Sequence, residues 1–152
     1  MTPQHKPDSK KASRLDPLSH ILVPVAHETD AKRTAKSLKQ YSFGRVTVLH
    51  VVEKRQGTYD KTPIEYSEEL AEKSYRVFRE EIPNADSEIT YTSDIVGAIF
   101  KVAEEIDATA IAFRPREGRR ILRILSGDLS LKLVTKGDRP VIALPDPKSI
   151  DS

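Results

Sequence analysis

The sequence contains no cysteine among its 152 residues. Disulfide bonds, a thiolate zinc site and a cysteine nucleophile are therefore excluded, and nothing indicates an oxidising compartment. Long apolar runs are also missing, both within the chain and in the N-terminal segment MTPQHKPDSKKASRLDPLSH, where a signal peptide would carry one. We expect a cytoplasmic protein that makes no use of the membrane.

Catalytic motifs are missing as well. The chain has no Walker A loop, no GxSxG elbow and no HExxH helix. The adjacent pairs Glu68-Glu69 and Glu104-Glu105 fall on predicted helices, where neighbouring side chains diverge and cannot act on one bond. The histidines lack the spacing of metal ligands, and His50 suits a hydrogen-bonded role inside a strand. These features predict a protein without enzyme activity and without a metal site.

A large excess of one charge is missing too, because the formal net charge is only +2. Such a weak overall field does not favour general nucleic-acid binding. The charge is unevenly distributed, however: acids outnumber bases from Glu53 to Asp94, whereas the segment 114–123 holds a single acid, Glu117, among arginines. Those arginines are Arg114, Arg116, Arg119, Arg120 and Arg123.

Apolar runs alternate with helical patterns along most of the chain. Short apolar or β-branched runs, typical of strands in a parallel sheet, occupy 20–26, 45–52, 88–92, 109–113 and 139–145. Helical spacing of apolar residues occurs between them, over 30–40, from Pro63, from Ser93 and over 126–137. The expected N-terminal caps are Thr29 or Asp30 for the first helix and Ser93 for the third.

Five strands alternating with four helices predict an α/β fold, a three-layer sandwich of the flavodoxin-like or Rossmann-like kind. Its parallel sheet would have the strand order 3-2-1-4-5. We expect this domain to span residues 19–146, after a disordered basic tail at 1–18 and before a flexible C-terminus at 147–152.

Ligands of such sheets bind beyond the carboxyl ends of the strands, where the winding direction reverses. The first and fourth strands flank that crevice, so the loops after Ala26 and after Phe113 should face each other. His27 stands at its mouth and could contact a ligand. The arginines of the second loop could hold a small anionic ligand by bidentate contacts, or could form a solvated loop with weak ion pairs.

Four segments carry a resemblance to a known family. These segments are ILVPVAHE at 21–28, VLHVV at 48–52, DATAIAF at 107–113 and PVIAL at 140–144. Their order is the one found in the universal stress protein family, which this chain resembles over roughly residues 20–145. The nucleotide-binding members of that family carry a sequence motif similar to G-x-x-G, then a spacer, then G followed by Ser or Thr. That resemblance implies a nucleotide site in the crevice.

The aligned residues depart from this motif. With the last glycine on Gly127, the first two glycine positions fall on Arg114 and Glu117, and Asp128 follows Gly127. Side chains at those positions hinder the close approach of backbone N–H groups to a phosphate. The carboxylate of Asp128 would itself interact with the free N–H groups and the positive dipole at the helix N-terminus. Ser130 is kept, whereas the carboxylate that closes the first strand in such members is replaced by Ala26.

We therefore expect no resident cofactor, although ATP or another nucleotide is an open alternative. The candidate anion-binding residues are Ala26, His27, Arg114, Arg116, Arg119, Arg120, Gly127, Asp128 and Ser130.

The resemblance also implies a homodimer formed through the last strand. The residues expected at that interface are Val141, Ile142, Ala143 and Leu144, a short apolar edge that would favour aggregation if left bare. The flanking prolines, Pro140 and Pro145, would limit the pairing to a few residues.

Three functions follow from these observations. The first is a non-catalytic, dimeric regulatory or binding module in the stress response, with a degraded ATP motif. The second is a sensor of ATP or AMP that uses the arginine loop in place of the glycine loop. The third is a basic adaptor for an acidic partner or nucleic acid; the tyrosines are not interleaved with cations, which disfavours nucleic acid.

Overall fold

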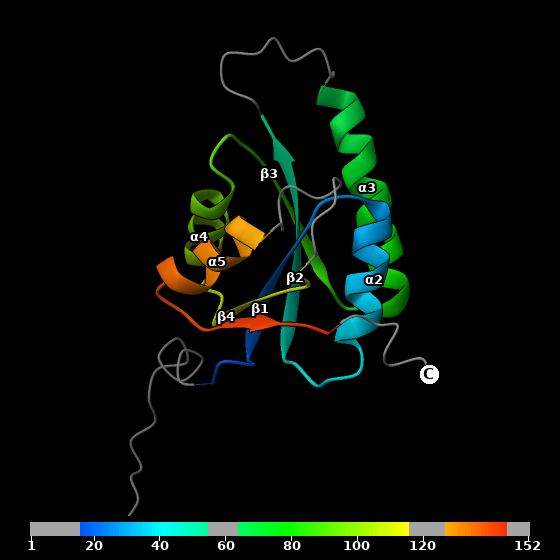
Figure 1. The fold of residues 1–152 in the computed structure, drawn as a ribbon. Helices are drawn as coiled ribbons and strands as arrows, with labels where there is room; N and C mark the ends of the chain where they lie inside the picture. Colours follow the sequence, from blue (N-terminus) through cyan, green and yellow to red (C-terminus); the bar gives the residue numbers. More distant parts are fainter. Residues whose placement is uncertain (1–15, 55–63, 116–126, 146–152) are drawn as a thin grey trace, which may run out of the picture.

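The structure is a computed structural model and describes residues 16–54, 64–115 and 127–145. Strands and helices alternate throughout these residues (Figure 1). The strands are β1 (His20–Val25), β2 (Arg45–Glu53), β3 (Asp86–Thr92), β4 (Ala110–Phe113) and β5 (Val141–Ala143). The helices are α2 (Glu28–Leu38), α3 (Ile64–Glu81), α4 (Ile95–Glu105) and α5 (Gly127–Lys136).

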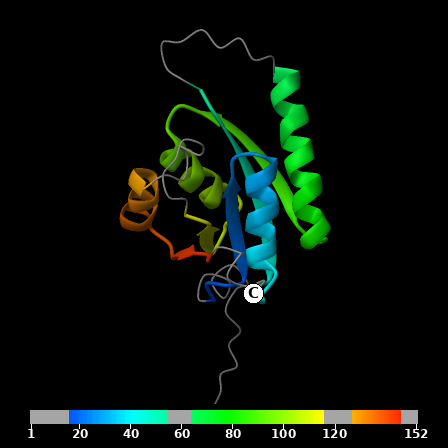
Figure 2. The ribbon, with the colours of Figure 1, turned by 45° about the vertical axis from the view of Figure 1, so that its right-hand side comes forward.

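The five strands form one parallel sheet with the order β3-β2-β1-β4-β5. Helices α2 and α3 cover one face, and α4 and α5 cover the other (Figures 1 and 2). This arrangement confirms the predicted α/β three-layer sandwich and its strand order. It also places β1 at the centre, with the chain winding outward in both directions from it.

The central position of β1 explains its nearly continuous apolar sequence. All six residues of β1 are buried. Val23 and Val25 pack beneath α2 and α3, whereas Leu22 packs beneath α4 on the opposite face. Complete burial of such a side chain stabilises the fold by about 1.5–3 kcal/mol. A strand with helices on both faces therefore needs apolar residues at every position instead of at alternate ones.

Two helices begin at residues other than the predicted caps. α2 is capped by His27, whose Nδ1 accepts the N–H of Asp30 at 3.4 Å, and the prediction of Thr29 or Asp30 as the cap was wrong. α4 is capped by Asp94, not Ser93, with Asp94 Oδ1 accepting the N–H of Gly97 at 3.1 Å. Consecutive polar residues before a helix can each serve as a cap, and the direction of the incoming chain selects among them.

The residues just before β1 are bonded to the domain. Leu18 accepts the N–H of Gly44 at 2.8 Å, and Pro17 accepts the hydroxyl of Thr109 at 3.0 Å. A Cβ at Gly44 would collide with the carbonyl oxygen of Ser19, so this close approach requires glycine. Residues 16–18, which the composition grouped with the tail, thus form a turn at the amino end of the sheet.

Two histidines are buried inside the sheet. His20 Nε2 lies 2.9 Å from Thr47 Oγ1, and His50 lies on β2. Burial lowers the pKa of His20 from its ordinary value of 6.5, and the nearby charge of Arg45 lowers it further. Burial also lowers the pKa of His50, with a smaller effect from His27. Both imidazoles are therefore neutral in the folded protein near neutral pH.

These histidines predict acid-sensitive stability. The unfolded chain binds protons on His20 and His50 at a higher pH than the folded chain does, so the free energy of unfolding should fall as the pH drops below about 6.5. Urea unfolding followed from about pH 7 to about pH 5 should show a flatter pH profile for the double variant His20→Gln/His50→Asn than for the natural chain. An equal slope in both proteins would contradict this assignment.

Candidate functional site

The carboxyl ends of β1 and β4 form the crevice that the topology predicts. The two strands are hydrogen-bonded neighbours, with Leu22 opposite Ile111. Ala26 follows β1 directly and Arg114 follows β4 directly. The loops that begin at these residues therefore lie at the same edge of the sheet, between the two halves of the winding.

A buried ion pair joins the two sides of this crevice. The Arg114 guanidinium donates to Asp30 Oδ1 at 3.0 Å, and the side chains are only 4% and 0% exposed. The partners are far apart in sequence, since Arg114 directly follows β4 and Asp30 lies in the first turn of α2. An arginine and a carboxylate are rarely buried this completely unless they are paired.

Asp30 also binds the backbone at the end of β1. Its Oδ2 accepts the N–H of Ala26 at 3.0 Å, and its Oδ1 receives the hydroxyl of Thr34 at 3.5 Å. One carboxylate thus ties together the end of β1, the first two turns of α2 and the end of β4. Its negative charge near the N-terminus of α2 is also favoured by the helix dipole.

Asp30 was not among the site residues predicted from the sequence. It was predicted only as a possible cap of the first helix, a role that His27 takes instead. The available signal was an acid in the first turn of the helix that follows the central strand. Side chains in a helix tilt toward its N-terminus, and Asp30 reaches back in this way to the N–H of Ala26.

The other predicted site residues are only partly brought together. His27 is exposed at the N-terminus of α2, and Ala26 is half-buried beside it. Gly127 and Asp128 form the start of α5, with half-buried Ser130 in its first turn. Arg116, Arg119 and Arg120 lie outside the residues that the structure describes.

The predicted dimer residues differ in exposure. Ala143 is exposed, and Val141 and Ile142 are half-buried on the short strand β5. Leu144 is 4% exposed and belongs to the core beneath α2 and α3, while its N–H donates to Phe113 at 2.8 Å. The first three residues therefore remain available at the sheet edge, whereas Leu144 stabilises the single chain.

Over residues 16–54, 64–115 and 127–145, no group of three or more His, Asp or Glu side chains is arranged to hold a metal ion. Within the same residues, no helix combines the length and apolar character needed to cross a bilayer.

Known proteins of one family match this chain in sequence pattern and in fold. A sequence model of the universal stress protein family matches residues 17–145. No curated protein gives a significant match. Among solved structures, a universal stress protein from Archaeoglobus fulgidus in complex with dAMP is 21% identical, with a TM-score of 0.57 over 84% of this chain and 98% of that one.

Two further structures have the same fold. A protein of the family from Burkholderia pseudomallei is 17% identical, with a TM-score of 0.59 over 86% of this chain and 98% of that one. A universal stress protein in complex with cAMP is 11% identical, with a TM-score of 0.55 over 84% of this chain and 98% of that one.

The buried pair predicts a large loss of stability on removal of one partner. Arg114→Met leaves the Asp30 carboxylate buried without its guanidinium, and the free energy of unfolding in urea should fall by about 3–5 kcal/mol. The double variant Asp30→Leu/Arg114→Met should recover much of that loss, because no isolated charge is left behind.

The exposed pair formed by Arg45 and Asp86 at 2.9 Å is the matched control. Arg45→Gln should cost less than about 1 kcal/mol because solvent screens exposed pairs. A cost for Arg114→Met no larger than that of Arg45→Gln would show that the guanidinium does not balance a buried charge.

Proposed function

The chain belongs to the universal stress protein family, and we propose that it acts as a non-catalytic, dimeric binding and regulatory module in the stress response, with its family's usual nucleotide site degraded. The observation that supports this proposal most strongly is the ion pair between Arg114 and Asp30. It uses the first arginine of the crevice loop for an internal contact, at the edge of the sheet where a ligand would be expected.

Energetics favour the internal contact over a ligand. A phosphate that recruited Arg114 would leave the Asp30 carboxylate buried and uncompensated, at a cost of about 3–5 kcal/mol. That cost corresponds to a loss of affinity of about a hundredfold or more. The buried carboxylate also repels an anion that enters the crevice beside it.

The sequence of the crevice loop supports the same proposal. Arg114 and Glu117 occupy positions where glycine would allow the backbone to approach phosphate. Asp128 adds an acidic residue at the second position of α5, where the positive end of the helix dipole would otherwise favour an anion.

A nucleotide sensor is the second candidate. Two proteins of similar fold are described in complex with nucleotides, one with dAMP and one with cAMP. In this alternative, the side chains of Arg116, Arg119 and Arg120 take the place of the glycine cradle. Arginine is well suited to that role because its planar fork matches phosphate oxygens.

The dimer would form through β5. This strand pairs with β4 on one side, and its other side is a sheet edge. The N–H of Leu144 points toward β4, so by alternation the N–H groups of Val141 and Ala143 point outward. Two copies of so short an edge could pair through these groups and cover their apolar side chains.

Nucleotide titration separates the two candidates. A ligand at about a hundred times its dissociation constant adds roughly 2.7 kcal/mol of stability, which raises the melting temperature by several degrees in a chain of this size. We expect no such rise with ATP, AMP or cAMP, and no nucleotide released when the purified protein is denatured. A concentration-dependent rise that is lost in Arg116→Ala/Arg119→Ala/Arg120→Ala would establish the sensor instead.

The oligomeric state tests the proposed dimer. Sedimentation should give a dimer for the natural chain and a monomer for Ala143→Pro, which removes an outward N–H without touching a bond to β4. Ala143→Val keeps that N–H and should remain dimeric. A monomeric natural chain, or a dimer that survives Ala143→Pro, would argue against pairing through β5.

A further inference from the structure

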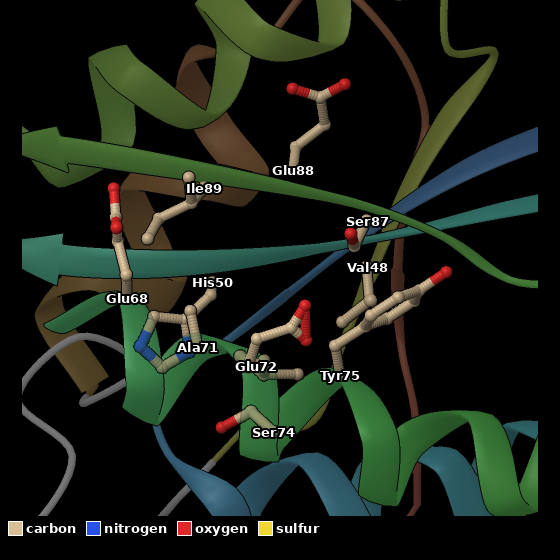
Figure 3. Close-up of a pocket in the computed structure, with 11 residues that line it drawn as sticks. Val48, His50, Glu68, Ala71, Glu72, Ser74, Tyr75, Ser87, Glu88 and Ile89 are labelled. Atoms are coloured by element: carbon tan, nitrogen blue, oxygen red, sulfur yellow. The ribbon is translucent and has the colours of Figure 1, made fainter. Parts of the chain in front are cut away.

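A hollow of about 420 Å³ lies outside the crevice, between α3 and the strands β2 and β3 (Figure 3). Its volume is in the range of small-molecule sites. It is lined by apolar and polar residues of α3, β2, β3 and the end of β1: Val25, Val48, His50, Glu68, Ala71, Glu72, Ser74, Tyr75, Ser87, Glu88 and Ile89.

Two buried polar groups among these residues lack hydrogen-bond partners. His50 is 7% exposed and Ser74 is 1% exposed, and neither His50 Nδ1 nor Ser74 Oγ has a partner in the described structure. Buried polar atoms are nearly always satisfied in native proteins, so each exception requires an explanation. A bound molecule that donates hydrogen bonds would satisfy both groups.

A buried histidine and a helical hydroxyl elsewhere in the described fold do have partners, although the buried hydroxyl of Tyr91 is also without one. The equally buried His20 is bonded to Thr47 at 2.9 Å. On α5, the hydroxyl of Thr135 donates to the carbonyl of Leu131 at 2.8 Å, which is the usual solution for a helical hydroxyl. His50 and Ser74 depart from this pattern, and both line the same hollow.

The charge around the hollow is negative. Glu68 and Glu72 are four residues apart on α3, so they share one face of the helix and repel each other. Among the described residues, none that lines the hollow is Lys or Arg, and neither glutamate forms an ion pair with another of these residues. On the same helix, Glu81 is paired with Lys39 at 2.6 Å.

Three further charged or titratable groups lie near the hollow. The Glu88 side chain extends to the other side of β3 in Figure 3, so its carboxylate does not face the hollow. Arg79 lies over the ring of Tyr75 and donates to Pro83, outside the hollow. Burial raises the pKa of Tyr91, and the negative charge of Glu68 raises it further.

These surroundings select a cation that carries several N–H donors. A neutral imidazole nitrogen and a hydroxyl oxygen can accept hydrogen bonds, and two carboxylates supply a compensating charge of two. Between the polar groups lie the apolar side chains of Val48, Ala71 and Ile89, which suit an aliphatic chain. The described residues offer no set of three metal ligands, which disfavours a divalent ion.

We propose that this hollow binds a short aliphatic polyamine, with Glu68 and Glu72 balancing its ammonium groups and with His50 and Ser74 accepting its N–H bonds. The site is separate from the crevice and does not depend on the proposed function. It is nevertheless adjacent to it, because His50 pairs in register with Val25, one residue before Ala26.

Calorimetric titration of the full chain with 1,4-diaminobutane at low ionic strength tests the proposal. We expect saturable binding at one site per chain, weakened roughly tenfold or more by Glu68→Gln or Glu72→Gln, since each removes a charge-assisted hydrogen bond. Glu69→Gln is the matched control: it removes the same charge from the same helix at an exposed residue that does not line the hollow. It should change the affinity by at most about twofold.

Ser74→Ala tests whether weaker diamine binding in a variant results from misfolding. It removes a buried hydroxyl without a partner, so the unliganded protein should be as stable as the natural chain or more stable, while diamine binding weakens. The proposal is overturned if binding does not saturate, if Glu69→Gln weakens it as much as Glu72→Gln, or if magnesium at equal concentration displaces the diamine.

Discussion

The contact between Asp30 and Arg114 organises the functional edge of this protein. One carboxylate receives the guanidinium of Arg114 at 3.0 Å and the N–H of Ala26 at 3.0 Å, so it links the ends of β1 and β4 to the start of α2. Both side chains are almost completely buried. Neither can change its partner without leaving the other charge uncompensated, which makes the pair a constraint on any ligand that enters the crevice.

The crevice and the hollow beneath α3 therefore differ in how their polar groups are satisfied. At the crevice, the Arg114 guanidinium and the Asp30 carboxylate balance each other's charge. Beneath α3, two glutamates and two buried polar atoms have no partner in the described chain. This contrast disfavours an anionic ligand at the crevice and favours a cationic one beneath α3, as proposed above.

Much of the fold was predictable because it rests on local periodicity. The apolar run of β1, the β-branched run RVTVLHVV of β2 and the spacing of Ile95, Ile99 and Val102 on α4 each report burial directly. Helix starts were less predictable. His27, Thr29 and Asp30 can all cap a helix, and the path of the chain leaving β1 decides which one does.

The sequence by itself determined the alternation of strands and helices and the parallel sheet with helices on both faces, because these depend on patterns within short segments and on the handedness of their connections. Only the tertiary structure decided that Arg114 turns inward to Asp30, and that His20 is satisfied while His50 is not. Those outcomes depend on partners distant in sequence and on burial, which local patterns do not encode.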